Sequence, residues 1–516
     1  MKNLSKIFIA AFLVAFASCE DDFDNPVEDI VVTSGDADFS KYISLGNSLT
    51  SGYTDNALFK SGQENSYPNI LATQMAMANG GIFKQPLMPD DIGGFSDLGV
   101  KGKFTLQIVN GSLTPVQMEA HSPLTMVSGS VNNMGVPGAK SYHLLAPGYG
   151  NPAGLANGTA NPYFVRFASS PSTSVLADAA AAQPTFFSLW IGNNDVLSYA
   201  TSGGVGVNQT GNTNPATYGG NDISDPQVVA GSIQTILETM RNQLGARGVI
   251  ANIPSITDIP FFTTVPYNPL TPEALGEGTI TTLNQTFSAL NQVYDVLGAS
   301  DRKITFNPDG PSPVVIEDET LTDMSQQIIQ AMMAGGADQT TAYFFGMAFG
   351  KARQATAQDL LVFTSQTVIG QVNNERLQML LGYGLPQEMA AQLSINGVTC
   401  PLSDQWVLIP SEKQAVLNAT DAYNAAIAQL ASTYDLAFVD AHAAMQQLSS
   451  QSGISYYGNN FTTTYVSGGA FSLDGVHLTG KGYAIVANLF VDAINLKYGS
   501  NLRHVNPNNY PGVVIP

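Results

Sequence analysis

The chain has 516 residues, of which 44% are hydrophobic and 12% are charged, and its net charge at pH 7 is −20. This length exceeds what one compact core usually holds, so we expect either one large elaborated domain or two. The excess of acidic over basic residues would repel a phosphate backbone, which argues against nucleic acid as a partner.

The N-terminus has the pattern of an export signal. Lys2 and Lys6 flank an apolar run from Ile7 to Ala17. This run is shorter than the ~20 residues of a membrane-spanning helix, so residues 1–18 are predicted to be a signal peptide, a short buried helix being the alternative. The stretch "FASCEDD" resembles a bacterial lipobox. The resemblance implies that Cys19 becomes the lipidated first residue of the mature chain. The alternative is a plain signal peptide that is cut near Ala17 and Ser18 without lipidation.

Residues 19–38 are predicted to form a solvated, acidic tether. Eight acidic residues lie between Glu20 and Asp38, with no clear periodicity. An acidic run directly after a lipidated cysteine resembles the surface-export signal of Bacteroidetes lipoproteins. We therefore expect an outer-membrane lipoprotein, with the cell surface as one option, that touches the membrane through its lipid only. Cys400 is the only other cysteine, so no intrachain disulfide is expected.

Strands and helices alternate through the predicted main domain, residues 39–510. The predicted strands are Lys41–Leu45, Thr185–Ile191, Gly248–Ile253 and Leu436–Asp440. The predicted helices run from Ser66 to Gly80, from Asp225 to Gly245, and over Ser411–Tyr434 and Gly480–Tyr498. Alternation of this kind predicts a three-layer α/β/α sandwich with a mostly parallel sheet.

Two stretches depart from the alternation and are predicted to be insertions. Residues 82–131 are rich in Gly, Pro and Thr and favour a small β-rich insertion, and residues 260–410 favour a helical one. The helical insertion carries several Met and Phe side chains: Met332, Met333, Phe344, Phe345, Met347 and Phe349. Such residues more often build a core than a ligand pocket, although a lid or groove built from them would suit an acyl chain.

One of the five histidines stands at a suggestive distance from an acid. His477 follows Asp474 by three residues in "SLDGVHLTGKGY", just before the last predicted helix. A serine hydroxyl becomes a nucleophile only when a base accepts its proton, and that base needs a third group to orient it. A tight turn at this loop would bring the Asp474 carboxylate onto the imidazole.

Three polar loops could join this pair at one sheet edge. Ser48 follows the first predicted strand, in "LGNSL"; "NMGVPGAKS" (133–141) is a glycine loop that opens a short helix; and "GNND" (192–195) follows the apolar strand. Ligands of open α/β sheets bind at the carboxyl ends of the strands, and free N–H groups at a helix start bind anions. The loops are therefore expected to converge on one crevice.

These four blocks, in this order, resemble the SGNH (GDSL-type) family of serine esterases and lipases. The resemblance implies a flavodoxin-like sheet, a Ser48–His477–Asp474 triad, and an oxyanion hole formed by the N–H of Ser48, the N–H of Gly138 and the amide of Asn194. Asn47 and Asp195 would hold these groups in position without belonging to the triad. Asn47 departs from the Asp that is usual in the family, and we expect the geometry of the loop to survive this change.

The remaining histidines are expected to be structural. His143 and His442 are interpreted as packing or capping residues, and His121 and His504 have no acid or cysteine at a ligand spacing. No metal site is predicted, and the expected chemistry needs no cofactor.

The expected activity is hydrolysis of a carboxylic ester, with a preference for acyl esters, through an acyl-enzyme in a monomer. The substrate would be a small-molecule or lipid ester. An O-acetyl glycan esterase with the same triad is the first alternative. A catalytically silent lipoprotein that binds a lipid or a protein partner is the second, and the presence of all three triad residues argues against it.

Overall fold

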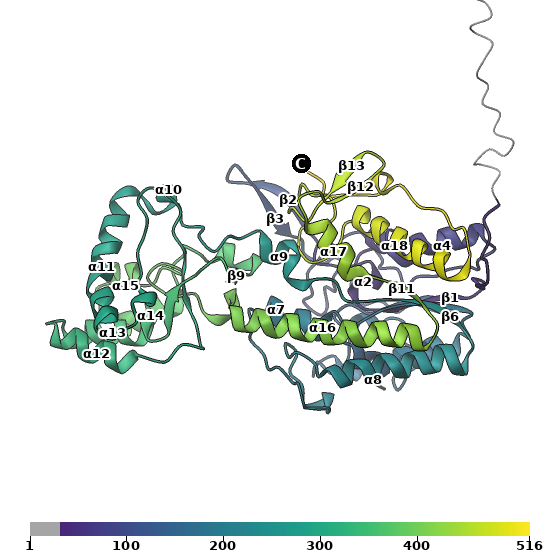
Figure 1. Cartoon of the computed structure of the whole chain (residues 1–516), viewed down its shortest axis with the longest axis horizontal. Helices are drawn as coiled ribbons and strands as arrows, with labels where there is room; N and C mark the ends of the chain where they lie inside the picture. The colour runs from purple at the N-terminus through teal and green to yellow at the C-terminus, as the bar shows by residue number, and fades with distance from the viewer. Residues whose placement is uncertain (1–30) are drawn as a thin grey trace, which may run out of the picture.

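The computed structural model describes residues 31–516 (Figure 1). The predicted signal peptide, Cys19 and the first part of the tether lie outside the described residues. Between residues 31 and 516, no helix has both the length and the apolar character needed to cross a membrane.

The main domain is built on a sheet of five parallel strands. They are β1 (Tyr42–Gly46), β4 (Asn133–Gly135), β5 (Phe186–Trp190), β6 (Arg247–Ala251) and β11 (Ala437–Val439). Their order across the sheet is β4-β1-β5-β6-β11, and every neighbouring pair is parallel. All residues of β1 and β5 are buried, as in a sheet covered on both faces. Numbered along the chain this is the flavodoxin order 2-1-3-4-5, and the predicted fold class is confirmed.

Helices cover both faces of this sheet (Figure 1). Helices α4 (Tyr67–Met77) and α18 (Gly480–Tyr498) lie together on one face, and α8 (Pro226–Leu237) and α16 (Pro410–Thr433) lie on the other. The C-terminal part of the helix predicted to end at Gly245 is a π-helical turn, η5 (Glu238–Gln243). Because the strands are parallel, their carboxyl ends meet at one edge, where the loops identified in the sequence leave the sheet.

Strand β4 was not predicted, because its three residues include a polar side chain and a glycine. Asn133 is nevertheless buried, and its amide donates hydrogen bonds to the carbonyl of Thr50 and to Gln85 Oε1, each at 3.0 Å. The side chain thus ties the edge strand to the segment after β1. The rest of "NMGVPGAKS" is a loop that leads into a short helix, as predicted; it is the 3₁₀ helix η2 (Ser141–Leu145).

The first insertion is mostly loop around a single hairpin. Its strands are β2 (Phe104–Val109) and β3 (Ser112–Gln117), which pair antiparallel.

The second insertion forms a separate lobe with its own hydrophobic core, at the left of Figure 1. Its helices are α10 (Pro272–Leu275), α11 (Glu277–Val296), α12 (Ser325–Ala334), α13 (Gln339–Phe349), α14 (Asn374–Gly382) and α15 (Gln387–Gln392), with a short ribbon of β7 (Val315–Glu317) and β8 (Ala352–Gln354). Met332, Phe344, Phe345 and Phe349 are buried in the packing of this lobe, whereas Met333 and Met347 are exposed. Most of the Met and Phe residues therefore serve as core.

A two-stranded ribbon joins the lobe to the main domain. Strand β9 (Leu360–Leu361) pairs antiparallel with β10 (Val407–Leu408). Leu361 and Val407 lie in the core of the lobe, while Leu408 lies in the core of the main domain. Successive side chains of a strand point to opposite faces, so this ribbon contributes to both cores at once.

The last residues of the predicted tether dock on the main domain. Val32 and Ala37 are buried, and the N–H of Asp36 donates to the carbonyl of Tyr498 at 2.8 Å. Gly35 has φ +56°, and a Cβ there would lie 2.1 Å from that same carbonyl oxygen, so only glycine fits. The solvated tether therefore ends before Asp38, against the C-terminal end of α18.

Candidate active site

Ser48 stands where β1 passes into the short helix α2 (Ser48–Ser51). The turn between them is tight, because a Cβ on Gly46 would lie 2.1 Å from Thr50 Oγ1 and 2.4 Å from the carbonyl oxygen of Trp190. Ser48 is the first residue of the helix, and its N–H has no acceptor among residues 31–516. The serine hydroxyl is thus held next to an unpaired backbone donor.

Asn47 fixes this turn with both atoms of its amide. Its Oδ1 accepts from the N–H of Leu49 at 3.1 Å, which caps α2, and its Nδ2 donates to Asn193 Oδ1 at 3.1 Å. The loop after β1 is thereby joined to the loop after β5.

The Asp474 carboxylate is saturated with donors. Oδ1 accepts from the N–H groups of Val476 and His477 and from Ser472 Oγ, and Oδ2 accepts from the N–H of Asn56 at 2.8 Å and from His477 Nδ1 at 2.8 Å. Burial alone would raise the pKa of this acid, but the charge and hydrogen bonds of His477 outweigh it and hold the pKa of Asp474 well below its usual range. The carboxylate is therefore ionised at neutral pH.

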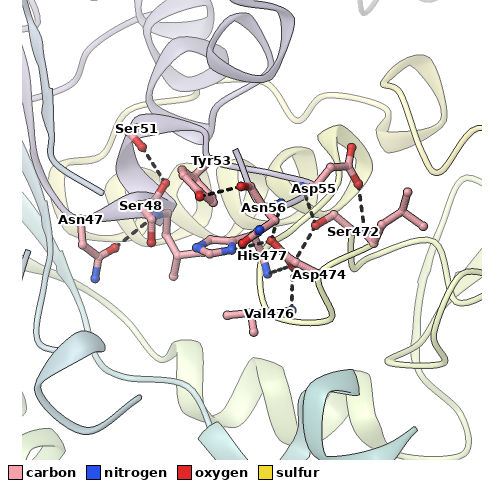
Figure 2. Close-up of polar contacts among 12 residues, drawn as sticks. Asn47, Ser48, Ser51, Tyr53, Asp55, Asn56, Ser472, Asp474, Val476 and His477 are labelled. Atoms are coloured by element: carbon pink, nitrogen blue, oxygen red, sulfur yellow. Dashed lines mark hydrogen bonds and ion pairs between the residues drawn. The ribbon is translucent and has the colours of Figure 1, made fainter. Parts of the chain in front are cut away.

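The ionised carboxylate sets the tautomer of His477. Because it can only accept, the ring proton lies on Nδ1, and Nε2 is left as the basic nitrogen. Figure 2 draws the imidazole between Asp474 and Ser48, which come from opposite ends of the chain. Among the described residues, Ser48 Oγ makes no hydrogen bond, so its hydroxyl is free to bond another group.

The turn after α2 contributes three further residues that sequence reasoning missed. Tyr53 places its ring 4.6 Å from that of His477, and its N–H donates to the carbonyl of Ser48. Asp55 and Asn56 are the two central residues of a turn closed by paired hydrogen bonds between Thr54 and Ala57, and both have positive φ. This is the geometry of a two-residue type I′ turn, which requires a positive φ at both central residues, a conformation that Asp and Asn tolerate.

This turn is hydrogen-bonded to the loop that carries Asp474 and His477. The N–H of Asn56 donates to Asp474, the Asp55 carboxylate accepts from the N–H of Leu473 at 3.0 Å, and the N–H of Asp55 donates to Ser472 Oγ (Figure 2). Burial, reinforced by the nearby Asp474 charge, raises the pKa of Asp55 to about 6.

The three loops predicted to form the crevice are bonded to one another. The N–H of Val136 donates to the carbonyl of Gly46 at 3.0 Å, and Asn194 Nδ2 donates to the carbonyl of Ala139 at 3.0 Å. Gly138 lies between these contacts with φ +79°, and its N–H has no acceptor in the described part of the chain. The second proton of the Asn194 amide makes no hydrogen bond to these residues either, so the edge presents several free donors.

Asp195 supports this arrangement from the interior. It is fully buried, and its two oxygens accept from the N–H of Ser141 at 2.7 Å and from Ser141 Oγ at 3.0 Å. Burial raises the pKa of this acid. Its contacts hold the start of η2, which fixes the Gly138 loop relative to α7 (Asn194–Thr201).

The other histidines have structural contacts. His143 Nδ1 accepts from the N–H of Lys140 at 3.1 Å and stacks on Tyr149, and burial together with the Lys140 charge lowers the pKa of His143 to about 4. The backbone N–H of His442 donates a hydrogen bond to Asn252 Oδ1 at 2.9 Å. His504 pairs with Asp492 at 2.7 Å, a contact that sequence spacing did not reveal.

One group of acids in residues 31–516 is close enough to hold a cation. Oxygens of Glu319, Asp404 and Glu412 lie within 4.8 Å of one another. Burial and mutual repulsion raise the pKa of Asp404 to about 6 and that of Glu412 to about 8. These acids therefore hold their protons to a higher pH than usual, which lowers the repulsion within the group.

Comparisons with known proteins add little to this geometry. No protein-family model and no curated protein matches the chain. Among solved structures, the chain is similar to a "putative GDSL-like lipase" from Parabacteroides merdae, with 10% identity and a TM-score of 0.30 over 90% of this chain and 99% of that one. At this score the likeness carries no weight of its own, and the chain is described by its fold: an α/β/α sandwich with a parallel five-stranded sheet.

Proposed function

We propose that the protein is a serine hydrolase that cleaves carboxylic esters. The observation that carries this proposal is the Asp474–His477 pair, whose ionised carboxylate leaves Nε2 as a base on the side of Ser48. The unpaired N–H groups of Ser48 and Gly138 support it, because an acyl-transfer site needs donors for the negative charge that develops on the carbonyl oxygen.

The reaction follows from these positions. His477 Nε2 accepts the proton of Ser48 Oγ as that oxygen attacks the ester carbonyl, and Asp474 stabilises the imidazolium that forms. The oxyanion accepts hydrogen bonds from Ser48 N–H, Gly138 N–H and the free proton of the Asn194 amide. His477 then gives its proton to the leaving alcohol, and water, activated by the same base, releases the acid and restores Ser48.

Labelling with a fluorophosphonate probe tests the proposal. The wild-type protein should be labelled, Ser48→Ala should lose the label, and heat-denatured protein should show none. Ser51→Ala is the matched control, since Ser51 lies on the same short helix and its hydroxyl only donates to the carbonyl of Ser48. Failure of the wild-type protein to react would reject a serine hydrolase.

A glycan O-acetyl esterase is the second candidate, favoured by one observation. A groove of about 1010 Å³ is lined by Tyr142, His143 and Asn161 among others, and the Asn161 amide donates to the carbonyl of Pro137, next to Gly138. Aromatic and polar side chains in a wide groove would suit a sugar on the alcohol side of the ester. Release of acetate from acetylated glycans, without turnover of longer acyl esters, would favour this candidate.

We also propose that lipidation at Cys19 anchors the protein to the outer membrane. The support is the lipobox-like "FASC" and the acidic run that follows it. Loss of the protein from the membrane fraction in a Cys19→Ser variant tests this anchor.

A further inference from the structure

An apolar cavity that is partly open lies beside the loops that carry Ser48 and His477. Its volume is about 90 Å³, and all of its lining side chains are apolar. The wall nearest the triad includes Leu49, which follows Ser48, and Val476, which precedes His477. Trp190, the last residue of β5, adds to the wall at the carboxyl edge of the sheet.

Two helices close the cavity on the far side. Ala444 and Leu448 of α17 (Ala441–Ser449) and Leu489 of α18 all line it. An unfilled apolar cavity costs stability, because its lining atoms lose their packing partners. Apolar cavities of this kind stay dry and bind apolar ligands instead of water.

We propose that this cavity is the acyl-chain subsite and that the protein prefers esters of short, unbranched fatty acids. The proposal rests on the proposed function, since the cavity is lined by Leu49 and Val476, the chain neighbours of Ser48 and His477. A volume of about 90 Å³ is a little over half that of the ~150 Å³ apolar cavity that binds a benzene ring, so the cavity suits a short acyl chain. Butyryl esters fit this room, hexanoyl esters reach its limit, an acetyl group leaves it empty, and a decanoyl chain exceeds it.

This assignment places the acyl chain in the main domain and not in the helical lobe. Most of the Met and Phe side chains of that lobe are buried in its own hydrophobic core. At the start of this insertion, the N–H of Phe261 donates to the carbonyl of Gly475 at 2.9 Å, and Phe261 itself lies in the core of the main domain.

The experiment fills the cavity without touching the catalytic groups. Ala444→Phe places a ring in the cavity, and Ala443→Phe places the same ring on the exposed face of the same helix. The kcat/KM for p-nitrophenyl acetate, butyrate, hexanoate and decanoate is measured for both variants and the wild type. We expect the butyrate-to-acetate ratio to fall about tenfold or more in Ala444→Phe only, because single methylene groups in an apolar pocket are worth such factors. An unchanged ratio would overturn the proposal.

Two further measurements separate the cavity from the hydrolase proposal. Binding of hexanoate by ligand-detected NMR should be seen in the wild type and lost in Ala444→Phe, and this result would hold even if no ester were cleaved. Absence of hexanoate binding to the wild type would overturn the subsite whatever the activity. If Ala444→Phe does not fold, Leu489→Ala serves instead: the enlarged cavity should shift the preferred ester towards longer chains, and an unshifted preference would contradict the proposal.

Discussion

Asn47 makes two hydrogen bonds at the turn that presents Ser48, and each uses a different atom of its amide. Asn193, which accepts one of them, keeps a buried Nδ2 with no partner among the described residues. An aspartate at position 47 would still cap α2. It would also accept from that Nδ2 once the Asn193 amide turned over.

We therefore expect Asn47→Asp to retain most of the fluorophosphonate labelling rate. Asn47→Ala should label more slowly and lose about 1 kcal/mol of stability, the usual value of a helix cap. Labelling rates and chemical denaturation of the two variants measure this difference. Equal behaviour of the two variants would mean that the cap does not position Ser48.

At the scale of residues, sequence patterns predicted the groups whose chemistry is distinctive. The spacing of Asp474 and His477 predicted a contact, and their side chains lie 2.8 Å apart. Two side chains three residues apart in a tight turn are held close together by the backbone. Tyr53 and Asn56 were missed for a physical reason. The ring of Tyr53 packs against the imidazole of His477, and Asn56 acts through its backbone N–H. Neither role requires a side chain that a sequence pattern would mark as functional.

At the scale of elements, the turn from Thr54 to Ala57 links the segment after Ser48 to the loop that carries Asp474 and His477. It leaves α2 a few residues after Ser48 and hydrogen-bonds the loop that carries Asp474. The proposed triad would thereby be positioned by contacts between the two ends of the chain.

Asp55→Ala should lower kcat/KM while leaving the protein folded. Without the carboxylate, the buried N–H of Leu473 loses its acceptor and the acid loop can shift, and a shift of about 1 Å can cost ~10²-fold in rate. Asn56→Gly is the matched control, because glycine keeps the positive φ and the N–H that Asp474 uses. Kinetics with one ester for both variants test the turn, and an active Asp55→Ala would contradict the role given to it.

The elements that the sequence predicted well are those with long, uniform patterns. The apolar run of β5 and the spaced apolar residues of α16 and α18 need no tertiary information to be recognised. Strand β4 is different, since Asn133–Gly135 is a strand only because β1 offers it an edge to pair with. Such tertiary pairing is invisible in a three-residue stretch.

At the scale of the whole molecule, the start of α16 belongs to a cluster of three acids, of which Glu412 is buried. Glu412, in the first turn of α16, has a pKa raised from 4.5 to about 8, chiefly by burial. The folded protein thus holds a proton that the unfolded chain releases. The contribution of this protonated group to the free energy of unfolding is fully present below about pH 4.5 and is lost as the pH rises through about 8.

Thermal unfolding should accordingly occur at a lower temperature at pH 8.5 than at pH 5.5, and Glu412→Gln should reduce the difference. Glutamine keeps an acceptor for the N–H of Ile409, which bonds Glu412 Oε2 at 2.9 Å. Glu388→Gln, at an exposed position on α15, is the control and should leave the difference unchanged. A pH dependence that Glu412→Gln did not alter would place its origin elsewhere.

The docking of Asp36 on Tyr498 determines which way an anchored molecule would face. Helix α18 begins beside the triad loop at Thr479 and ends where the tether arrives, and its 19 residues span about 28 Å. A lipid at Cys19 would thus be joined to the folded domain at the end of α18 that lies away from the loop of His477. We expect this attachment to favour esters from the surroundings over the lipids of the supporting membrane. In vesicle assays, dispersed butyrate esters should be hydrolysed equally by the anchored protein and by Cys19→Ser, while esters embedded in the vesicle that carries the protein should be cleaved slowly.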